Sequence, residues 1–317
     1  MSNGKYNINS TEIIGWLDKR GYSFALLGRS SEGFVPASIF EYIENGFYFL
    51  KEGFMNNELR DCCILTSSSI IADRYSEENL ILLLNTDEQS VYYEIMRDFF
   101  QEKSNGKISN TAIIKDSATI GSNVQIDDFV VIGEATIGDN TIIKSHTVIN
   151  DEVIVGENVV IGCQSVIGAD GIAWAWDSEQ EERIRMPQLG GVCIEEGAVL
   201  AANTIIARGS LNEKSRIGKN SFLAPGCRLG HGTNIGSHAH LSNNIVTAGN
   251  VSIGDNSFVG SGAIFQPRVS IHSETIVGAG AVVNKDTTQA GMTLIGIPAR
   301  EKQTNPNSKG MPQIKRK

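Results

Sequence analysis

A six-residue repeat runs through most of this sequence, beginning at about Lys107. Every sixth residue from Ile217 to Val283 is apolar except Thr247, and many of these residues precede glycine or another turn former. A period of six matches neither the period of an α-helix nor that of a plain strand. It predicts short strands that turn a corner and repeat, with one side chain per step pointing into a triangular prism. Gly, Asn and Asp suit such corners because they tolerate a positive φ.

The repeat has one long interruption. The same period is present earlier in the chain as far as Ile167, and it resumes at Ile194. The segment between them, near 169–191, contains Trp174 and Trp176 and has no six-residue period. A loop that projects from a regular solenoid is often functional or part of an interface. Alternatively, large aromatic side chains can simply cover apolar surface. Both readings of this loop stay open.

Two folded parts are expected, because 317 residues exceed what one core usually serves. Residues 105–299 should form a left-handed parallel β-helix and residues 1–104 a small α/β domain, which makes the protein mainly β. The polar residues 300–317 should form a flexible tail. In the first domain, apolar runs between polar breaks predict a helix over 11–20, strands over 24–27, 47–51, 62–66 and 80–84, and a helix that follows the capping box Thr86-x-x-Gln89 and ends near Lys103.

Composition excludes several classes of function. The 27 Lys and Arg residues against 36 Asp and Glu residues give a net charge of −9, which argues against a surface for nucleic acid or anionic membrane. We find no apolar run of about 20 residues and no secretory signal, so we expect a cytoplasmic protein without a transmembrane segment. The cysteines are odd in number and lack CxxC spacing, so neither a disulfide framework nor a zinc site is indicated.

Catalytic chemistry on a flat-sided prism usually needs a groove between subunits, and a homotrimer would supply three. Among the histidines, His231 is the candidate general base, because imidazole titrates near neutral pH. Gly249 lies 18 residues later, one coil on, so its N–H should stack about 4.8 Å above His231 and could stabilise an oxyanion. A solvated surface histidine is the alternative. We expect no metal site, because the five histidines differ in register, although one across a subunit boundary stays possible. The histidines are His146, His231, His238, His240 and His272.

Several motifs resemble UDP-3-O-acylglucosamine N-acyltransferases of lipid A biosynthesis, a family of the hexapeptide-repeat acyltransferases. They are Val166-Ile167-Gly168-Ala169-Asp170-Gly171, Met186-Pro187-Gln188-Leu189-Gly190-Gly191, Ala202-Asn203-Thr204, Arg208-Gly209-Ser210-Leu211 and Leu229-Gly230-His231. The resemblance implies that His231 is the catalytic base, that Gly249 supplies the oxyanion amide, and that the enzyme is a homotrimer whose first domain binds the uridine part of a nucleotide sugar. It implies substrate contacts at Phe49, Phe54, Met55, Asp170, Gln188 and Arg268.

Some residues depart from the family pattern. Two aromatic residues six apart sandwich the uracil in the family, whereas here Phe49 is matched by Met55, with Phe54 adjacent. Arg268 stands where the family carries a second histidine. The last coil instead resembles that of coenzyme A-dependent sugar acetyltransferases. This second resemblance implies donor contacts at Gly260, Gly278, Ala279 and Lys285.

The leading hypothesis is transfer of an acyl group from a thioester to the amino group of a nucleotide-linked amino sugar. The donor is either acyl carrier protein or coenzyme A, and no tightly bound cofactor is expected. One alternative is an acetyl coenzyme A-dependent sugar O- or N-acetyltransferase of surface-polysaccharide synthesis. Another is a non-catalytic solenoid that only binds partners, because fold alone does not define function.

Overall fold

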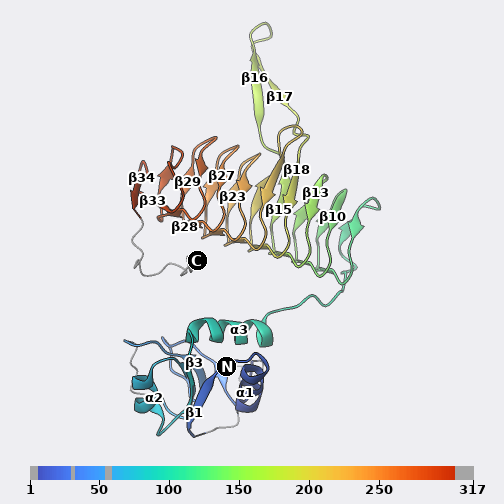
Figure 1. Ribbon diagram of the computed structural model, residues 1–317. Coiled ribbons are helices and arrows are strands. Elements are labelled where there is room, and N and C mark those ends of the chain that lie inside the picture. The colour runs from blue at the N-terminus through green and yellow to red at the C-terminus, as the bar shows by residue number, and fades with distance from the viewer. Residues whose placement is uncertain (1–5, 30–32, 54–58, 304–317) are drawn as a thin grey trace. The chain divides into compact units, whose positions relative to one another are not determined.

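The structure is a computed structural model that describes residues 6–29, 33–53 and 59–303. It divides into two compact units, Met1–Glu102 and Lys103–Lys317, two residues before the boundary expected from sequence. Figure 1 shows an α/β unit and a long stack of short strands. No helix of the described residues is long and apolar enough to cross a membrane.

The first unit is a sheet with helices on both faces. The sheet order is β1-β5-β4-β3-β2, with β1 antiparallel to β5 and the other pairs parallel. Helices α1 and α3 help to bury one apolar cluster, and α2 another on the opposite face. The elements are α1 (Ser10–Lys19), β1 (Phe24–Gly28), β2 (Val35–Pro36), β3 (Gly46–Phe49), β4 (Cys63–Thr66), α2 (Ser69–Tyr75), β5 (Leu80–Leu84) and α3 (Glu88–Phe100).

Helix α3 begins one residue later than the sequence motif predicted. The side chain of Asp87, not Thr86, caps the helix by accepting a hydrogen bond of 2.8 Å from the N–H of Ser90. The helix also ends at Phe100, short of the expected Lys103. Asp87 can accept from the backbone at this spacing as well as a threonine can, and a carboxylate near the helix dipole is the more favourable cap.

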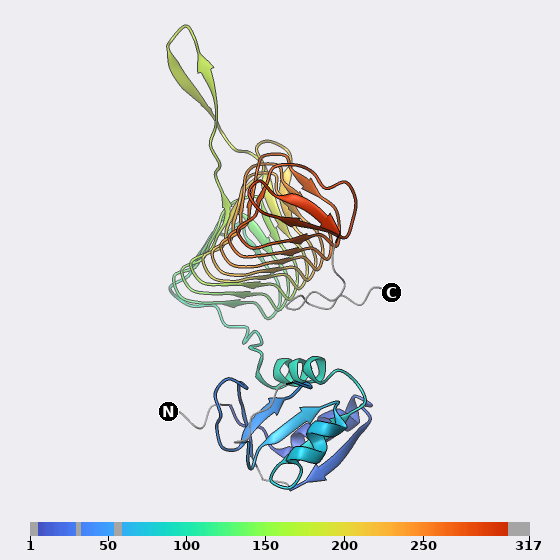
Figure 2. The same ribbon diagram turned by 90° about the vertical axis from the view of Figure 1, so that its left-hand side faces the viewer.

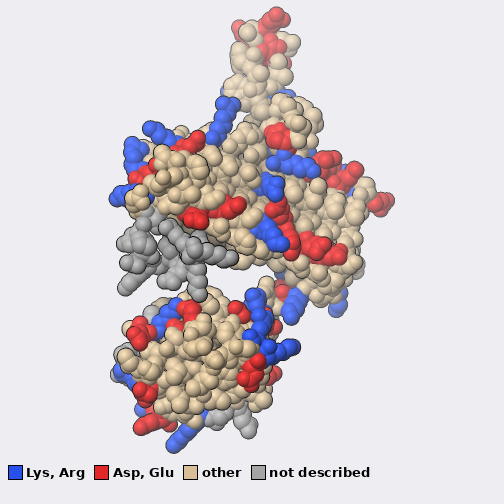
Figure 3. Space-filling view, in the orientation of Figure 1, with Lys and Arg blue, Asp and Glu red and all other residues tan. Residues whose placement is uncertain are grey.

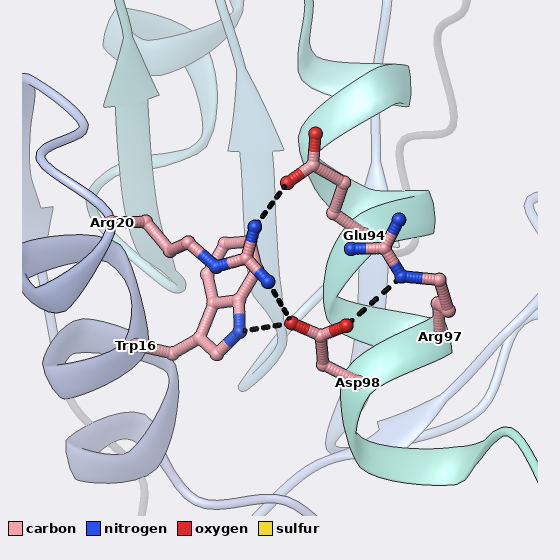
Figure 4. Close-up of polar contacts among 5 residues, drawn as sticks. All are labelled: Trp16, Arg20, Glu94, Arg97 and Asp98. Atoms are coloured by element: carbon pink, nitrogen blue, oxygen red, sulfur yellow. Dashed lines mark hydrogen bonds and ion pairs between the residues drawn. The ribbon is translucent and has the colours of Figure 1, made fainter.

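A polar network joins α1 to α3 (Figure 4). The guanidinium of Arg20 contacts Glu94 and Asp98, and it lies 5.0 Å from the ring centre of Trp16. The indole N–H of Trp16 donates to Asp98 at 3.0 Å, and Arg97 pairs with the other carboxylate oxygen. These bonds hold the two helices in one relative position over the same face of the sheet.

The second unit is a parallel β-helix with three faces, as the six-residue repeat predicted. In each coil the chain passes along face 1, then face 2, then face 3, and the coils stack along one axis (Figure 2).

Face 1 contains β6 (Ile113–Ile114), β9 (Val131–Ile132), β12 (Val148–Ile149), β15 (Val166–Ala169), β20 (Ile205–Ala207), β23 (Arg228–Leu229), β26 (Val246–Thr247), β29 (Ile264–Phe265) and β32 (Val282–Val283). Face 2 contains β7 (Thr119–Ile120), β10 (Ala135–Ile137), β13 (Val153–Val155), β18 (Gly191–Ile194), β21 (Lys214–Ile217), β24 (Asn234–Ile235), β27 (Ser252–Ile253) and β30 (Ser270–Ile271). Face 3 contains β8 (Gln125–Ile126), β11 (Ile142–Ile143), β14 (Val160–Ile161), β19 (Val199–Leu200), β22 (Phe222–Leu223), β25 (His240–Leu241), β28 (Phe258–Val259), β31 (Ile276–Val277), β33 (Met292–Ile295) and β34 (Arg300–Gln303).

The residues predicted to point inward form the core of the prism. Every sixth residue from Ile217 to Val283 is buried, including Thr247. Strands of neighbouring coils pair in register at a spacing of 18 residues, as Leu229 with Thr247 shows. Asparagine holds many corners with a positive φ, for example Asn244 at 58°. Stacked branched side chains thus form a continuous apolar column that no single coil could make.

The interruption of the repeat is a hairpin. Strands β16 (Ala173–Asp177) and β17 (Glu182–Met186) pair antiparallel, and the hairpin projects from the prism (Figures 1 and 2). At the end of the chain, Arg300–Gln303 form β34 against β33, so these residues do not belong to the expected flexible tail. The rest of that tail, 304–317, lies outside the described residues.

Candidate functional site

The candidate site lies on the edge where face 1 passes into face 2, which we call the 1–2 edge. Two successive coils carry insertions at this edge, and the coil that follows them presents His231 at a regular corner. The hairpin is inserted at this edge after β15, and the turn 208–213 is inserted there after β20. His231 lies at the corner after β23. The two insertions therefore flank the histidine on one side, and regular coils continue on the other.

His231 lies between a hydroxyl group and a glycine. Its Nδ1 lies 3.0 Å from Oγ of Ser210. On the other side, a Cβ added to Gly249 would lie only 2.2 Å from Nε2, so the imidazole rests directly against this glycine. His231 is half-buried, so a ligand on this edge can reach the ring. The predicted pair of His231 and Gly249 is adjacent in the structure.

The amide of Gly249 is available for a ligand. The carbonyl oxygen of Gly249 accepts from Arg268 at 3.0 Å, and the next N–H, of Asn250, donates to the carbonyl of His231 at 2.7 Å. Within the described residues, the N–H of Gly249 has no hydrogen-bond acceptor. A backbone donor that the fold leaves unused beside a histidine is the arrangement expected of an oxyanion site.

The turn that carries Ser210 is held by Glu213. One oxygen of its carboxylate accepts from the N–H of Ser210 at 2.6 Å, and the other accepts from the N–H of Leu211 at 2.9 Å. Hydrogen bonds lower the pKa of the Glu213 carboxyl. The largest contribution comes from the N–H of Leu211, followed by the N–H of Glu213 itself, and the N–H and hydroxyl of Ser210 add to it. The carboxylate is therefore ionised at neutral pH, close to the hydroxyl that touches His231.

Thr247 is the single polar residue in the apolar run, and its hydrogen bonds explain why it is there. Its Oγ1 accepts from the N–H of Gly230 at 3.0 Å and lies 2.9 Å from Oγ1 of Thr233. Gly230 and Thr233 flank the corner that presents His231. A buried hydroxyl needs hydrogen-bond partners, and here those partners hold the strand ends on each side of the catalytic candidate.

Gln188 lies near the histidine with an unsatisfied side chain. The residue is 6% exposed, and neither Oε1 nor Nε2 has a partner in the described part of the chain. A Cβ on Gly171 would lie 3.3 Å from Oε1 of Gln188 and 3.9 Å from Cβ of His231, so these three residues surround one point. A buried amide without partners costs free energy, which a ligand with polar groups would recover.

Arg208 ties together both ends of the hairpin. Its guanidinium donates to the carbonyl oxygens of Gly168 at 3.1 Å, Asp151 at 2.7 Å and Gln188 at 3.5 Å. The carboxylate of Asp170 lies 3.6 Å from Arg208 and 3.7 Å from Arg185, and its side chain is 55% exposed. Asp170 therefore lies at the open rim, bound to two arginines.

The other predicted ligand contacts separate into two groups. Arg268 is exposed on the 1–2 edge, next to Gly249. Lys285 lies on the same edge. Strand register puts it three coils beyond His231, which is about 14 Å along the prism. Gly260 stacks on Gly278 and Ala279 at the edge between faces 3 and 1. One chain therefore does not bring Lys285 together with these three residues.

Histidines other than His231 lie elsewhere. His238 and His272 lie at corners between faces 2 and 3, His146 between faces 3 and 1, and His240 within face 3, stacked on Phe258. Burial lowers the pKa of His240. No group of three metal-binding side chains occurs in the described residues.

Phe49 belongs to an aromatic cluster in the first unit. Its ring centre lies 5.2 Å from that of Tyr92 and 6.0 Å from that of Tyr93, which is exposed. The expected partners Phe54 and Met55 lie outside the described residues. Lys51, two residues after the end of β3, pairs with Asp87 at 3.0 Å. Phe49 thus lies at the carboxyl end of a parallel strand, where α/β sheets commonly bind ligands.

The hairpin presents two kinds of surface. Trp174 and Trp176 pair across the strands with Arg185 and Arg183, and the guanidinium of Arg183 lies 4.7 Å from the ring centre of Trp174. Both tryptophans are about half exposed. Acidic side chains gather at the tip, as Figure 3 shows. They are Asp177, Glu179, Glu181 and Glu182.

Sequence reasoning did not assign Ser210, Glu213, Arg208 or Thr247 a part in this site. Two signals were present. The spacing Ser210-x-x-Glu213 is typical of a turn in which side chains bond to backbone N–H groups. Thr247 was the one polar residue in an otherwise apolar run.

Comparison with known proteins identifies the repeat. Residues 117–151, 134–169 and 250–285 match the family described as bacterial transferase hexapeptide (six repeats). LpxA from Acinetobacter baumannii is 27% identical, with a TM-score of 0.53, over 62% of this chain and 73% of that chain. UDP-N-acetylglucosamine O-acyltransferase (LpxA) from Moraxella catarrhalis RH4 is 24% identical, with a TM-score of 0.55 and the same coverage. LpxA, a UDP-N-acetylglucosamine acyltransferase from Bacteroides fragilis 9343, is 24% identical, with a TM-score of 0.56, over 62% of this chain and 74% of that chain. The chain therefore carries bacterial transferase hexapeptide repeats on the fold of known acyltransferases.

Proposed function

We propose that this protein transfers an acyl group from a thioester to the amino group of a nucleotide-linked amino sugar. The observation that carries the proposal is the contact between His231 and Gly249, which puts a proton acceptor beside an unused backbone donor. The hexapeptide repeats of transferase type support an acyl-transfer reaction. Gln188 and Arg268 adjoin the same pair and are available for polar groups of the sugar nucleotide.

The reaction needs one proton acceptor and one oxyanion donor. His231 takes a proton from the attacking amine as the nitrogen bonds to the thioester carbonyl carbon. The N–H of Gly249 stabilises the negative oxygen of the tetrahedral intermediate. The carbon–sulfur bond then breaks, the carbonyl re-forms, and the thiolate leaves with the proton that His231 took up. The product is an amide, and no residue is covalently modified.

The nucleotide base and the acyl donor would contact different units of the chain. Phe49 and its aromatic neighbours in the first unit would stack on the base of the nucleotide. Lys285 on the 1–2 edge, and Gly260, Gly278 and Ala279 on the edge between faces 3 and 1, would contact the donor, which is either acyl carrier protein or coenzyme A. Because these donor residues lie on different edges of one chain, a shared donor site would need two chains side by side.

A homotrimer of parallel prisms would bring two such edges together. Light scattering on the purified protein should give three times the chain mass of 34.3 kDa, which is 3 × 34.3 or about 103 kDa. A monomer at concentrations that support full turnover would contradict this part of the proposal.

Transfer to oxygen is the second candidate, because the similar protein from Moraxella catarrhalis is an O-acyltransferase. Purified protein should be offered acyl carrier protein and coenzyme A thioesters, with a UDP-linked amino sugar or its N-acetylated form as acceptor. The N-acyl proposal predicts a product that survives mild alkali, whereas an ester would be cleaved. Turnover of only the N-acetylated sugar, to an alkali-labile product, would replace the leading proposal.

The histidine assignment has a direct test. His231→Gln should lower turnover by about 10²–10⁴-fold, because a general base contributes that much. His238→Gln is the matched control, since His238 lies on another edge and is exposed. Unchanged turnover in the His231 variant would remove the proposed base.

A further inference from the structure

We propose that Ser210 and Glu213 set the tautomer of His231. In this arrangement Nδ1 carries the proton and donates to Oγ of Ser210, and Nε2 keeps its lone pair for the incoming amine. The tautomer is a property of the free protein. Only its catalytic consequence rests on the proposed function.

The contact between His231 and Ser210 is compatible with two tautomers of the imidazole. Nδ1 of His231 and Oγ of Ser210 are 3.0 Å apart, and either atom could be the donor. If the hydroxyl donated, Nε2 would carry the proton. Two N–H donors, that of Gly249 and that of Nε2, would then lie side by side. No group at this point could accept a proton.

The carboxylate of Glu213 selects between the two tautomers. Both of its oxygens accept backbone N–H groups of the same turn, from Ser210 and from Leu211, so it cannot swing away from Ser210 without breaking two bonds. A carboxylate only accepts, and each of its oxygens has room for a further donor. Its low pKa keeps it charged. A negative charge beside the hydroxyl attracts the hydroxyl proton, which leaves the Ser210 oxygen as an acceptor for Nδ1.

The chain contains a second imidazole–hydroxyl pair that serves as an internal reference. Nδ1 of His272 lies 2.8 Å from Oγ1 of Thr287, on a corner between faces 2 and 3. That hydroxyl already accepts the backbone N–H of His272 at 2.8 Å. Substitutions at Ser210 or Glu213 should therefore leave the signals of His272 unchanged.

The test is nitrogen NMR of the full chain with ¹⁵N-labelled histidine rings, at a pH where the rings are neutral. His231→Gln identifies the signals of His231 by their loss. We expect a protonated Nδ1 and an unprotonated Nε2 in the native protein. Ser210→Ala and Glu213→Gln should each shift the two signals toward the other tautomer. The separate variant Ser210→Thr keeps the hydroxyl and should show the native pattern.

Activity is the second readout. Ser210→Ala should lower turnover on the order of tenfold, less than loss of His231 itself, because the base remains but its reactive tautomer becomes less populated. Ser237→Ala is the matched control, because this serine lies on the edge between faces 2 and 3.

The outcomes separate the two proposals. A native His231 with the proton on Nε2, or signals that do not respond to Ser210→Ala and Glu213→Gln, overturns the inference whether or not the protein is active. The expected tautomer together with full turnover in His231→Gln supports the inference and rejects the proposed function.

Discussion

Gly249 occupies a position where the imidazole of His231 leaves no room for a side chain. An added Cβ would lie 2.2 Å from Nε2 and 2.6 Å from Cε1, so the ring would have to move. Movement would also break its contact with Ser210, because that contact is on the opposite side of the ring. The glycine is therefore needed for space, in addition to the donor role proposed for its N–H.

The prediction at this scale is that Gly249→Ala lowers turnover by about 100-fold, the cost expected when a catalytic group is displaced by about 1 Å. Steady-state kinetics with whichever of the two UDP-linked acceptors the protein turns over would measure it. Gly15→Ala is the control, because no atom lies within 4 Å of the added methyl group. Wild-type turnover in the Gly249 variant would mean that the ring and this amide do not act together.

Polar side chains contribute contacts that hold the base of the hairpin and that join α1 to α3. A two-stranded hairpin is marginally stable by itself in water. Here Arg208, whose side chain is 13% exposed, bonds to carbonyl oxygens before and after the hairpin and so closes its base. This closure also keeps Gln188 and Gly171 beside His231.

Asp98 gives the α1–α3 pair a pH dependence. The hydrogen bond from Arg97, followed by that from Trp16, lowers the pKa of Asp98 below its ordinary value of 3.8. A carboxyl group with a lowered folded pKa stabilises the fold above its unfolded pKa, and the stabilisation is lost as pH falls through the folded pKa. Asp98→Asn should therefore be less stable than the parent at pH 7, and the difference should shrink below about pH 3.8.

Urea unfolding followed by the fluorescence of Trp16 measures this difference. Trp174→Phe and Trp176→Phe leave Trp16 as the only tryptophan, since the sequence has three. A difference between the two proteins that stays constant from pH 7 to pH 3 would show that the charge of Asp98 does not contribute.

At the scale of the whole prism, stability is the sum of coils that contact only their neighbours. Ile235 is fully buried in the apolar column, and Ile154 is an outward isoleucine that is 40% exposed. Ile235→Ala should cost about 2–5 kcal/mol, whereas Ile154→Ala should cost less than about 1 kcal/mol. Hydrogen exchange should show faster opening in the coils next to Ile235 than in distant coils. Uniform acceleration along the prism would instead indicate one cooperative unit.

The first unit was predicted less fully than the prism. Its longer elements were found, but the two-residue strand β2 and the short helix α2 were not predicted. The cap of α3 was assigned to Thr86 instead of Asp87, because both residues have side chains that can accept from the backbone. Short elements and exact helix ends depend on packing and on competition between neighbouring polar side chains, which a local pattern does not resolve.

The amino-acid sequence by itself determined the β-helix, the inward residues, the interruption near 169–191 and the pairing of His231 with Gly249. These features follow from a repeat of constant length, because a fixed step puts residues 18 apart on adjacent rungs. Only the tertiary structure decided that Ser210, Glu213 and Arg208 lie around the histidine, and that Gln188, which the resemblance had implied as a substrate contact, lies beside it. They come from two insertions of irregular length, and the paths of such segments depend on side-chain contacts between coils rather than on any period in the chain.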